Sequence, residues 1–295
     1  MNDIRAITLA AGGRWHSSYG TAPCPICQPD RRPDQNALTL RDGLAGQLLA
    51  HCKKSGCDFV AIAAALGGNL GKIRHPTAEE TERRYKEERL IADRKATVAD
   101  RIWREAIPMI GTLGETYLRR RGITCVLPTT LRFHPTCRHP QSGKGLPAII
   151  ARIEGGDHTA IHRTWLAEDG TGKAQVDPPK AMLGAVGGGA VRLVEGQGGL
   201  AVAEGIETAL SLARGLLKAP VSVWAALSAG GLARLKLPAS GGLLIVATDG
   251  DVAGRSSGQT LADRASRLGW EVSILPAADG ADWNDFVQAS NGASQ

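Results

Sequence analysis

Two short apolar runs in the last third of the chain have the pattern of fully buried strands. Leu200–Ala203 and Leu243–Thr248 are almost continuously apolar, which is typical of strands covered on both faces in a parallel sheet. A helical pattern follows each run, over Ile206–Leu217 and Ala253–Leu268, and this order of strand, turn and helix predicts an α/β sheet. The remaining expected elements here are strands at Val221–Leu227 and Glu271–Leu275, a short helix over 232–236 and a last helix from Asp282.

Acidic residues come directly after both runs. Glu204 follows the first run, and Asp249 and Asp251 follow the second. Because ligands bind outside the carboxyl ends of the strands in such sheets, we expect these carboxylates to gather at one edge, where their repulsion requires a cation. A few hard oxygen ligands suit Mg²⁺, which keeps several waters and completes its shell from phosphates. Two such ions can hold the attacking and leaving oxygens of a phosphoryl transfer.

The ordered acidic motifs carry a family resemblance, which covers about a third of the chain, residues 199–295. The Toprim domain of bacterial-type primases, topoisomerases and some nucleases is similar to the series Glu204-Gly205, Asp249-Gly250-Asp251 with Ala253-Gly254-Arg255, and Asp282-Trp283-Asn284-Asp285. The resemblance implies that Glu204 works as a general acid/base or as a metal ligand. It also implies that Asp249 and Asp251 bind catalytic Mg²⁺ or Mn²⁺, two ions in all, and that Asp282 completes the metal shell.

The chain departs from the Toprim pattern at two positions. The second acid of the last motif usually stands two residues after the first, but this chain has Asn284 there and Asp285 one residue later. Many primases also have an acid four residues after the glutamate, where this chain has Thr208 with Glu207 beside it. The departures leave a third metal and the role of Asp285 open. Arg255 could neutralise a substrate phosphate or pair with a nearby acid.

Four cysteines near the N-terminus have the spacing of a structural zinc site. A C-x₂-C pair, Cys24 and Cys27, is followed after a gap by a C-x₄-C pair, Cys52 and Cys57. Two such pairs are the ligand set of a closed tetrahedral site for one Zn²⁺. His51 could replace Cys52, but neighbouring strand residues point to opposite faces, so only one of the two can bind. The elements expected around the pairs are strands at Ala37–Leu40 and Leu48–Ala50 and a helix at Phe59–Leu66.

The same cysteine segment resembles the zinc-binding domain at the N-terminus of bacterial and phage primases. The order C-P-x-C, then H-C-x₄-C, then an apolar helix carries this resemblance. It implies that the zinc ribbon helps to select a single-stranded DNA template. That family often has His at the second ligand position and closes with C-x₂-C, whereas this chain has Cys27 and two inserted residues. Neither change damages a tetrahedral site.

The middle of the chain predicts a connecting helix followed by a basic α+β subdomain. Residues 76–110 are charged and helix-prone, with Thr77 or Thr81 as candidate caps. Short strands of mixed polarity are expected at Leu131–His134, Ala148–Ile153, Ala160–Leu166 and Ala190–Val194, which favours an antiparallel sheet. His134, Cys137 and His139 look like a metal cluster, but Pro135 and Pro140 predict a turn there, and no fourth ligand follows at a useful spacing.

Basic residues of this middle region resemble the basic half of the primase polymerase core, which precedes the Toprim half. The candidates for phosphate contacts with template or incoming nucleotide are Arg163, Lys173 and Lys180, with Arg255 from the Toprim half. Arg119–Arg121 are instead expected on a solvated helix face.

Composition supports a polyanionic partner and a reducing compartment. The net charge of +6 and the pI near 9.1 favour nucleic acid binding. Six cysteines without a secretion signal indicate metal ligation and not disulfides, so we expect a cytoplasmic protein. Nothing approaches 18 consecutive apolar residues, so no membrane span is expected. A GxxxxGK[ST] motif is absent, and any strand separation would come from a separate helicase.

Taken together, the patterns predict four segments and one function. The segments are a zinc ribbon at 1–72, a charged helical linker at 73–112, a basic α+β subdomain at 113–198 and an α/β Toprim domain with a mostly parallel sheet at 199–295. The resemblance implies a DNA primase that makes short RNA primers from NTPs on single-stranded DNA. The small size resembles stand-alone primases of phages, plasmids and other mobile elements.

Two other functions stay open from sequence. One is another Toprim phosphotransfer enzyme, a nuclease or a topoisomerase. A topoisomerase needs a nucleophilic tyrosine, and Tyr19, Tyr85 and Tyr117 all lie outside a recognisable strand-cleavage domain. The other is a non-catalytic, zinc-dependent single-stranded DNA-binding protein, which the missing acid at Thr208 allows.

Overall fold

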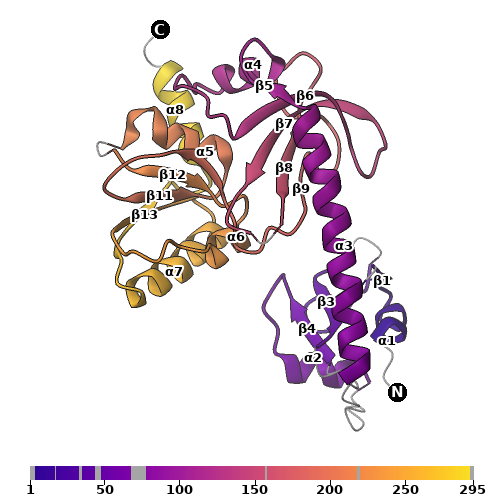
Figure 1. Cartoon of the computed structure of the whole chain (residues 1–295). Helices are drawn as coiled ribbons and strands as arrows, with labels where there is room; N and C mark the ends of the chain where they lie inside the picture. Colours follow the sequence, from indigo (N-terminus) through magenta and orange to yellow (C-terminus); the bar gives the residue numbers. More distant parts are fainter. Residues whose placement is uncertain are drawn as a thin grey trace. The chain divides into compact units, whose positions relative to one another are not determined.

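The structure is a computed structural model, and it describes residues 4–16, 18–32, 35–43, 48–67, 78–156, 158–217 and 220–292. The chain divides into two compact units, Met1–Arg89 and Leu90–Gln295 (Figure 1). The expected boundary at 72/73 and the candidate cap Thr77 lie outside the described residues, and the boundaries at 112/113 and 198/199 stay predictions. Among the described helices, none combines the length and apolar character that a membrane span needs.

The first unit is a small antiparallel sheet with a helix on either side of it in sequence. Its elements are α1 (Ile4–Ala10), β1 (Arg14–Trp15), β2 (Gly20–Ala22), β3 (Leu38–Asp42), β4 (Leu48–Cys52) and α2 (Phe59–Ala65), with strand order β1-β2-β3-β4. Asp58 caps α2 by accepting a hydrogen bond from the Ala61 N–H at 3.0 Å. Buried Leu38, Leu40 and Ile62 lie in a core that the cysteines share, which is small for a unit of this length.

The second unit begins within α3 (Ala78–Glu105), which confirms the predicted helix. A five-stranded antiparallel sheet follows, in the order β5-β6-β7-β8-β9, together with α4 (Leu113–Arg120). The strands are β5 (Ile107–Pro108), β6 (Leu131–Arg138), β7 (Gly145–Ile153), β8 (Ala160–Trp165) and β9 (Lys180–Leu183). The predicted turn around Pro135 is wrong, because β6 continues through it, and a register shift between His134 and Cys137 accommodates the proline.

The two faces of this antiparallel sheet are buried by different neighbours. On one face, Ile150, Ile161 and Trp165 pack with Trp103 of α3 in one hydrophobic cluster. The alternate residues of the same strands, such as Ile149 and Ala160, point to the other face. They belong to a cluster that also contains residues of the second sheet. Side-chain alternation along β8 therefore decides which residues can face that second sheet.

The second sheet has the predicted α/β architecture. Its strand order is β10-β12-β11-β13-β14, and only the pairing of β10 with β12 is antiparallel. The strands are β10 (Val191–Val194), β11 (Leu200–Ala203), β12 (Ser222–Ala225), β13 (Leu243–Thr248) and β14 (Glu271–Pro276). All four residues of β11 are buried, as expected for a central strand covered on both sides. The predicted fold class is confirmed.

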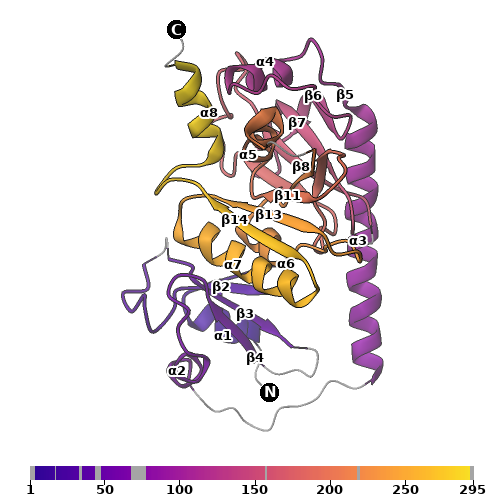
Figure 2. The same ribbon diagram turned by 90° about the vertical axis from the view of Figure 1, so that its left-hand side faces the viewer.

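Helices cover both faces of the second sheet (Figure 2). They are α5 (Ile206–Ser211), which continues as the π-helix η1 (Leu212–Leu216), then α6 (Ala229–Arg234), α7 (Val252–Arg267) and α8 (Trp283–Gly292). Leu200 and Val202 lie in a cluster with residues of α6 and α7, whereas Ala201 and Ala203 lie in the cluster that includes α5. The cluster with Ala201 and Ala203 also contains residues of α4 and β7. The antiparallel sheet and the second sheet therefore share one hydrophobic core.

Candidate functional site

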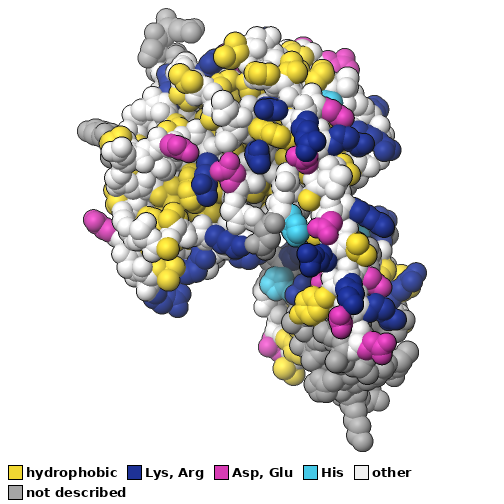
Figure 3. All heavy atoms as spheres, in the orientation of Figure 1, with side chains coloured by type: hydrophobic (Ala, Val, Ile, Leu, Met, Phe, Trp, Pro, Cys, Tyr) yellow, Lys and Arg dark blue, Asp and Glu magenta, His cyan; other side chains and the backbone are white. Residues whose placement is uncertain are grey.

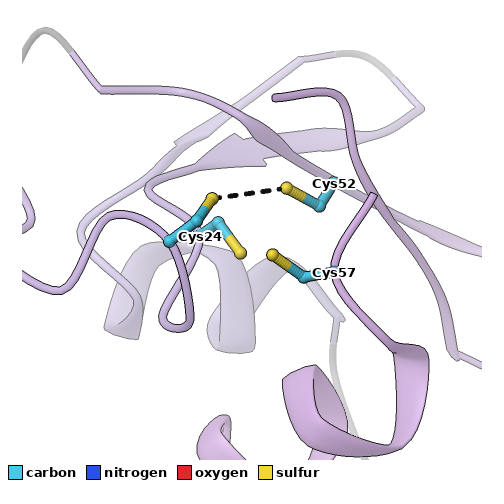
Figure 4. Close-up of side chains that lie close together, drawn as sticks. Cys24, Cys52 and Cys57 are labelled. Carbon is cyan, nitrogen blue, oxygen red and sulfur yellow. Dashed lines mark hydrogen bonds between the residues drawn. The ribbon is translucent and has the colours of Figure 1, made fainter. Parts of the chain in front are cut away.

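Four sulfur atoms converge in the first unit. The Sγ atoms of Cys24, Cys27, Cys52 and Cys57 all lie within 4.8 Å of one another, and Cys27 Sγ is 3.5 Å from Cys52 Sγ. Figure 4 shows the labelled side chains pointing to a common centre. Tetrahedral zinc with Zn–S bonds of about 2.3 Å places neighbouring sulfurs about 3.8 Å apart, so the described cluster fits one Zn²⁺.

Local structure selects cysteine and not histidine at the third position. Cys52, the last residue of β4, is buried, and His51 before it is exposed, as strand alternation requires. Burial raises the pKa of Cys52, but hydrogen bonds from the backbone N–H groups of Ser55 and Cys57 outweigh it and lower that pKa to about 6. The loop between the last two ligands therefore favours the thiolate that binds metal.

Acidic side chains gather at the carboxyl edge of the second sheet, as predicted. β11 and β13 pair in parallel, with Ala203 opposite Ala247. Glu204 and Asp249 therefore follow the ends of two neighbouring strands, and neighbouring strands in a sheet are spaced about 4.8 Å apart. Burial and the charges of Glu204, Asp282 and Asp251 raise the pKa of Asp249 to about 6. Burial and the charge of Asp251 raise the pKa of Glu204. These effects place all four carboxylates in one electrostatic site.

Two of the acids also begin helices. Asp251 caps α7 by accepting a hydrogen bond from the Gly254 N–H at 2.6 Å. At α8, Asp282 Oδ1 accepts from the N–H groups of Asn284 and Asp285, and Asp285 Oδ2 accepts from the Asp282 N–H at 2.9 Å. This reciprocal pair is a capping arrangement, and it gives Asp285 a structural place next to the site.

Gly250 brings the last acid to the first ones. A Cβ at this position would lie 1.8 Å from the carbonyl oxygen of Ala278, so no other residue fits without moving that backbone. The Gly250 N–H donates to the Ala281 carbonyl at 2.9 Å, and the Gly280 N–H donates to the Gly250 carbonyl at 3.1 Å. The turn of Asp249–Asp251 is thereby joined to the loop that leads into Asp282.

The acidic edge fits divalent cations. Asp249 Oδ1 is buried and has no hydrogen-bond partner within the described residues. A buried carboxylate oxygen without a donor is costly unless a cation pairs with it. The described part of the chain holds one compact cluster of metal-ligating atoms, the four sulfurs, and the carboxylates are spaced more widely. Such spacing suits Mg²⁺, which retains several waters.

Lysines from the antiparallel sheet face this acidic edge. Lys180 begins β9, and its charge acts against the raised pKa of both Glu204 and Asp249. Lys173 Nζ lies 3.1 Å from Glu207 Oε1. The strand register places Thr164 opposite Lys180, so Lys180 shares a sheet face with the buried His162. Of the predicted cations, Lys180 therefore acts on the acids of the edge, and Lys173 pairs with Glu207, three residues after Glu204.

The two predicted arginines lie differently. Arg163 is only 7% exposed, and its guanidinium stacks over Trp165 at 4.9 Å, on the face that packs with α3 and away from Lys180. The structure thus does not bring Arg163 to the acids. In β8, Arg163 alternates with His162 and Thr164, which share a sheet face with Lys180, so its side chain points to the opposite face. Arg255 pairs with Asp279 and donates to the Gly250 carbonyl at 3.3 Å. It braces the turn that carries Asp249 and Asp251.

Two departures from the Toprim pattern have structural explanations. Asn284 is fully buried, and its side-chain amide donates to the Arg121 carbonyl at 2.8 Å and to Ser211 Oγ at 2.9 Å. Arg121 Nε in turn donates to Asn284 Oδ1, so the residue predicted on a solvated face is a contact to α8. Thr208 is buried in α5, and Glu207 beside it takes the ion pair with Lys173.

Sequence reasoning missed Tyr117 and His162. Tyr117 is buried, and its hydroxyl donates to Glu207 Oε1 at 2.8 Å across 90 positions of sequence. Burial lowers the pKa of His162 to about 4, and Glu207, Lys180 and Lys173 all act on it. No local pattern marks either residue. The only sequence signal is that His162 lies within a predicted strand, Ala160–Leu166.

Two stretches of the chain match known domain families. Residues 199–293 match the Toprim domain, and residues 93–193 match a domain of unknown function, DUF7146. The first match confirms the predicted Toprim domain. No protein of curated function matches the chain.

Solved structures with a detectable likeness include three bacterial primases. A DNA primase domain from Pseudomonas aeruginosa is 16% identical with a TM-score of 0.42, covering 66% of this chain and 74% of that one. The zinc-binding and RNA polymerase domains of the Aquifex aeolicus primase give 16% identity and a TM-score of 0.42, covering 100% and 81%. The RNA polymerase domain of the Mycobacterium tuberculosis primase gives 14% and 0.39, covering 69% and 80%. Values this low establish no activity.

Proposed function

We propose, for a chain whose residues 199–293 form a Toprim domain, that the protein is a DNA primase that synthesises short RNA primers on single-stranded DNA. One observation carries the proposal. Glu204, Asp249, Asp251 and Asp282 form one electrostatic site at a sheet edge, and Lys180 from the preceding basic sheet acts on the same carboxylates. One site then combines acids that suit cations with a lysine that suits phosphates.

The carboxylates would hold two Mg²⁺ or Mn²⁺ ions. Asp249 and Asp251 are the main ligands in this proposal, and Asp282 completes the shell. When bound, the metal ions stabilise the charge that develops on the attacking oxygen, the α-phosphate and the leaving pyrophosphate. Asp251 can ligate with the carboxylate oxygen that does not cap α7.

Glu204 is suited to proton transfer. Its raised pKa makes the carboxylate a better base than an ordinary glutamate, and it stands next to the metal ligands at the end of β11. In the proposed reaction, the 3′-hydroxyl oxygen of the primer attacks the α-phosphate of the incoming NTP, and pyrophosphate leaves. A carboxylate oxygen of Glu204 accepts the proton of that hydroxyl. Lys180 and Lys173 would bind the triphosphate oxygens, and Arg255 would support the metal-binding turn.

Template binding would involve both units. The zinc cluster would hold single-stranded DNA in the first unit, and the net charge of +6 favours a phosphate backbone as partner. In Figure 3, Lys and Arg side chains gather over the part of the second unit that carries the antiparallel sheet. We expect binding to weaken steeply with salt. A separate helicase would supply strand separation.

Primer synthesis from labelled NTPs on single-stranded templates tests the proposal. We expect short RNA products with Mg²⁺ or Mn²⁺, and a loss of at least about 100-fold in Asp249→Asn. Asp263→Asn is the matched control, because Asp263 is an exposed acid of α7 that bonds to Gln259 and lies outside the acidic edge. The control should retain full activity.

Other outcomes select other functions. Metal-dependent degradation of the template, lost in Asp249→Asn, would replace the primase with a nuclease on the same site. Template binding without turnover under either metal would leave a non-catalytic zinc-dependent DNA-binding protein.

A further inference from the structure

We propose that Glu207 is a positioning residue that, together with Tyr117, fixes the ammonium of Lys173 for the phosphates of the incoming nucleotide. The inference rests on the proposed function and deepens it. It assigns a role to a largely buried acid that lies three residues after Glu204 and is not needed as a metal ligand.

Side chains from three separate segments of the chain meet at one carboxylate oxygen of Glu207. Glu207 lies in the first turn of α5, three positions after Glu204. Its Oε1 accepts a hydrogen bond from the Tyr117 hydroxyl of α4 at 2.8 Å and lies 3.1 Å from Nζ of Lys173, in the connection between β8 and β9. A single carboxylate oxygen thus ties the basic half of the unit to the Toprim half.

The second argument concerns charge. Burial acts to raise the pKa of Glu207, but the charge of Lys173 and the hydrogen bond from Tyr117 outweigh it and lower that pKa to about 2. Burial and the Glu207 charge raise the pKa of Tyr117, so the phenol stays protonated as a donor. The carboxylate is therefore charged, and the phenol neutral, throughout the pH range of polymerase chemistry.

The third argument is that Lys173 stays available to a ligand. Its side chain is 31% exposed, whereas that of Glu207 is 13% exposed. An ammonium has three N–H donors, and Glu207 Oε1 uses one of them. A free lysine loses rotamer entropy when it is ordered, and an ion pair made beforehand removes most of that loss from nucleotide binding.

The fourth argument places Lys173 in the same site as the acids. The side chain of His162 is buried, and the charges that act on it include those of Glu207, Lys180 and Lys173, with Arg163 beside it in β8. Lys180 also acts on Glu204 and Asp249. With its pKa lowered to about 4, the His162 imidazole adds no charge near the two lysines at neutral pH. The nucleotide phosphates would therefore meet the ammonium group of Lys173, held by Glu207, together with that of Lys180.

A double-mutant cycle tests the inference. Glu207→Gln keeps the shape and an acceptor for Tyr117 but removes the charge that holds Lys173. We expect the KM for NTP to rise about tenfold with kcat changed less than about twofold, since the chemistry at the acids is untouched. Lys173→Met should raise KM at least as much, and the double variant should match Lys173→Met alone because Glu207 acts through Lys173. Tyr117→Phe should raise KM in the same direction by a smaller factor.

Glu154→Gln is the matched control. It removes the charge of an ion pair of similar length, 3.3 Å to Arg192 Nε, next to the end of β7 that pairs with Ala160, whereas Lys180 pairs with Thr164 toward the other end of β8, so KM should stay unchanged. The Kd of a non-hydrolysable NTP analogue with Mg²⁺, measured by calorimetry on the full chain, gives a readout without catalysis. Thermal unfolding shows whether each variant is folded. If Glu207→Gln does not fold, the KM of Tyr117→Phe is used to test the inference.

The outcomes separate the two proposals. Additive effects of Glu207→Gln and Lys173→Met on Kd, or a fall in kcat at unchanged KM, would overturn the positioning role while primer synthesis by the wild-type chain upheld the function. If the wild type makes no primers but the analogue binds and the cycle is non-additive, the function fails and the positioning role stands. A wild-type chain that binds no analogue would refute the positioning role.

Discussion

Asn284 shows how one residue can depart from a motif and still be required. It stands where an acid is usual, but its amide donates to the Arg121 carbonyl and to Ser211 Oγ, and neither acceptor can turn into a donor to replace it. The Arg121 carbonyl has no proton, and the Ser211 hydroxyl already donates to the Glu207 carbonyl at 2.9 Å. The asparagine is thus selected by its donors.

We therefore predict that Asn284→Asp destabilises the protein instead of restoring a metal site. An ionised carboxylate would face two buried acceptors, at a cost of about 1–3 kcal/mol in the free energy of unfolding at pH 7, partly offset by Arg121. Urea unfolding measures this cost. Asn36→Asp, at an exposed asparagine, should change the free energy by less than about 0.5 kcal/mol. A more stable Asn284→Asp variant with tighter Mg²⁺ binding would contradict this account.

The raised pKa of Asp249 leads us to predict that both the stability of the protein and its binding of divalent cations depend on pH. Its pKa of about 6 in the folded chain lies above the ordinary 3.8, so the ionised form is disfavoured by folding. This group's penalty is absent below pH 3.8, where both states are protonated, grows as pH rises from 3.8 to 6, and is complete above 6. Divalent cation binding, which requires the ionised form, should weaken as pH falls through about 6.

Asp249→Asn should consequently stabilise the metal-free protein. At pH 7.5 in chelator we expect a gain of about 1–2 kcal/mol, discounted for partial solvent access, and no gain at pH 3.5. Adding Mg²⁺ should raise the melting temperature of the wild type and leave that of the variant unchanged. Equal Mg²⁺ stabilisation of both proteins would show that Asp249 is not a ligand.

At the scale of elements, the central strands of the second sheet could be predicted from sequence because β11 is buried throughout and β13 is mostly buried. β11 and β13 have the bounds predicted from their apolar runs, and α7 begins one residue before the predicted start. The central errors come from tertiary context. The predicted strand over Val221–Leu227 is shortened to Ser222–Ala225, and β6 runs through Pro135 because a bulge, invisible in the pattern, accepts the proline.

The candidate site was predictable only where a motif is local. The acids follow strands in sequence, and the cysteine pairs have fixed spacing, so both sets could be found without a structure. Arg163 was predicted from the resemblance of the basic region to a primase core, which does not give the phase of β8, and that phase places its side chain over Trp165. Tyr117 could not be found, because its partner Glu207 lies 90 positions away and only the packing of α4 against α5 brings them together.

The loop before α8 supplies a prediction at this scale. In Gly250→Ala the new Cβ would meet the Ala278 carbonyl, so the loop must move and carry Asp282 with it. A displacement near 1 Å in an active site costs up to about 100-fold in rate, and we expect metal-dependent primer synthesis to fall about 10- to 100-fold. Activity assays at saturating NTP measure this loss.

Gly242→Ala is the control for Gly250→Ala. Gly242 precedes β13 in the same sheet, and a Cβ there would make one ordinary contact, 3.9 Å from the Trp270 ring. Its activity should stay within about twofold of the wild type. Full activity in Gly250→Ala would show that Asp282 does not need its observed position.

For the whole molecule, the two units differ in what holds them together. Among the residues that the structure describes, the second unit has three hydrophobic clusters, one of which joins its antiparallel and parallel sheets. Within the same residues, the first unit has one small cluster, which contains Cys24 and Cys52 themselves. Structural zinc contributes on the order of 10 kcal/mol in small metal-binding peptides, which is comparable to the stability of a whole domain. We infer that metal, more than apolar burial, folds the first unit.

Zinc removal should therefore unfold one unit and spare the other. In Cys24→Ser/Cys27→Ser, metal analysis should fall from about one zinc per chain to none, and limited proteolysis should cut within residues 1–89 while a fragment from about residue 90 onward persists. Cys125→Ser, a cysteine outside the cluster, should keep the zinc and the proteolytic pattern of the wild type. Because the acidic edge lies wholly in the second unit, its stabilisation by Mg²⁺ should survive in the double variant. Loss of that stabilisation together with the zinc would mean that the two units fold as one.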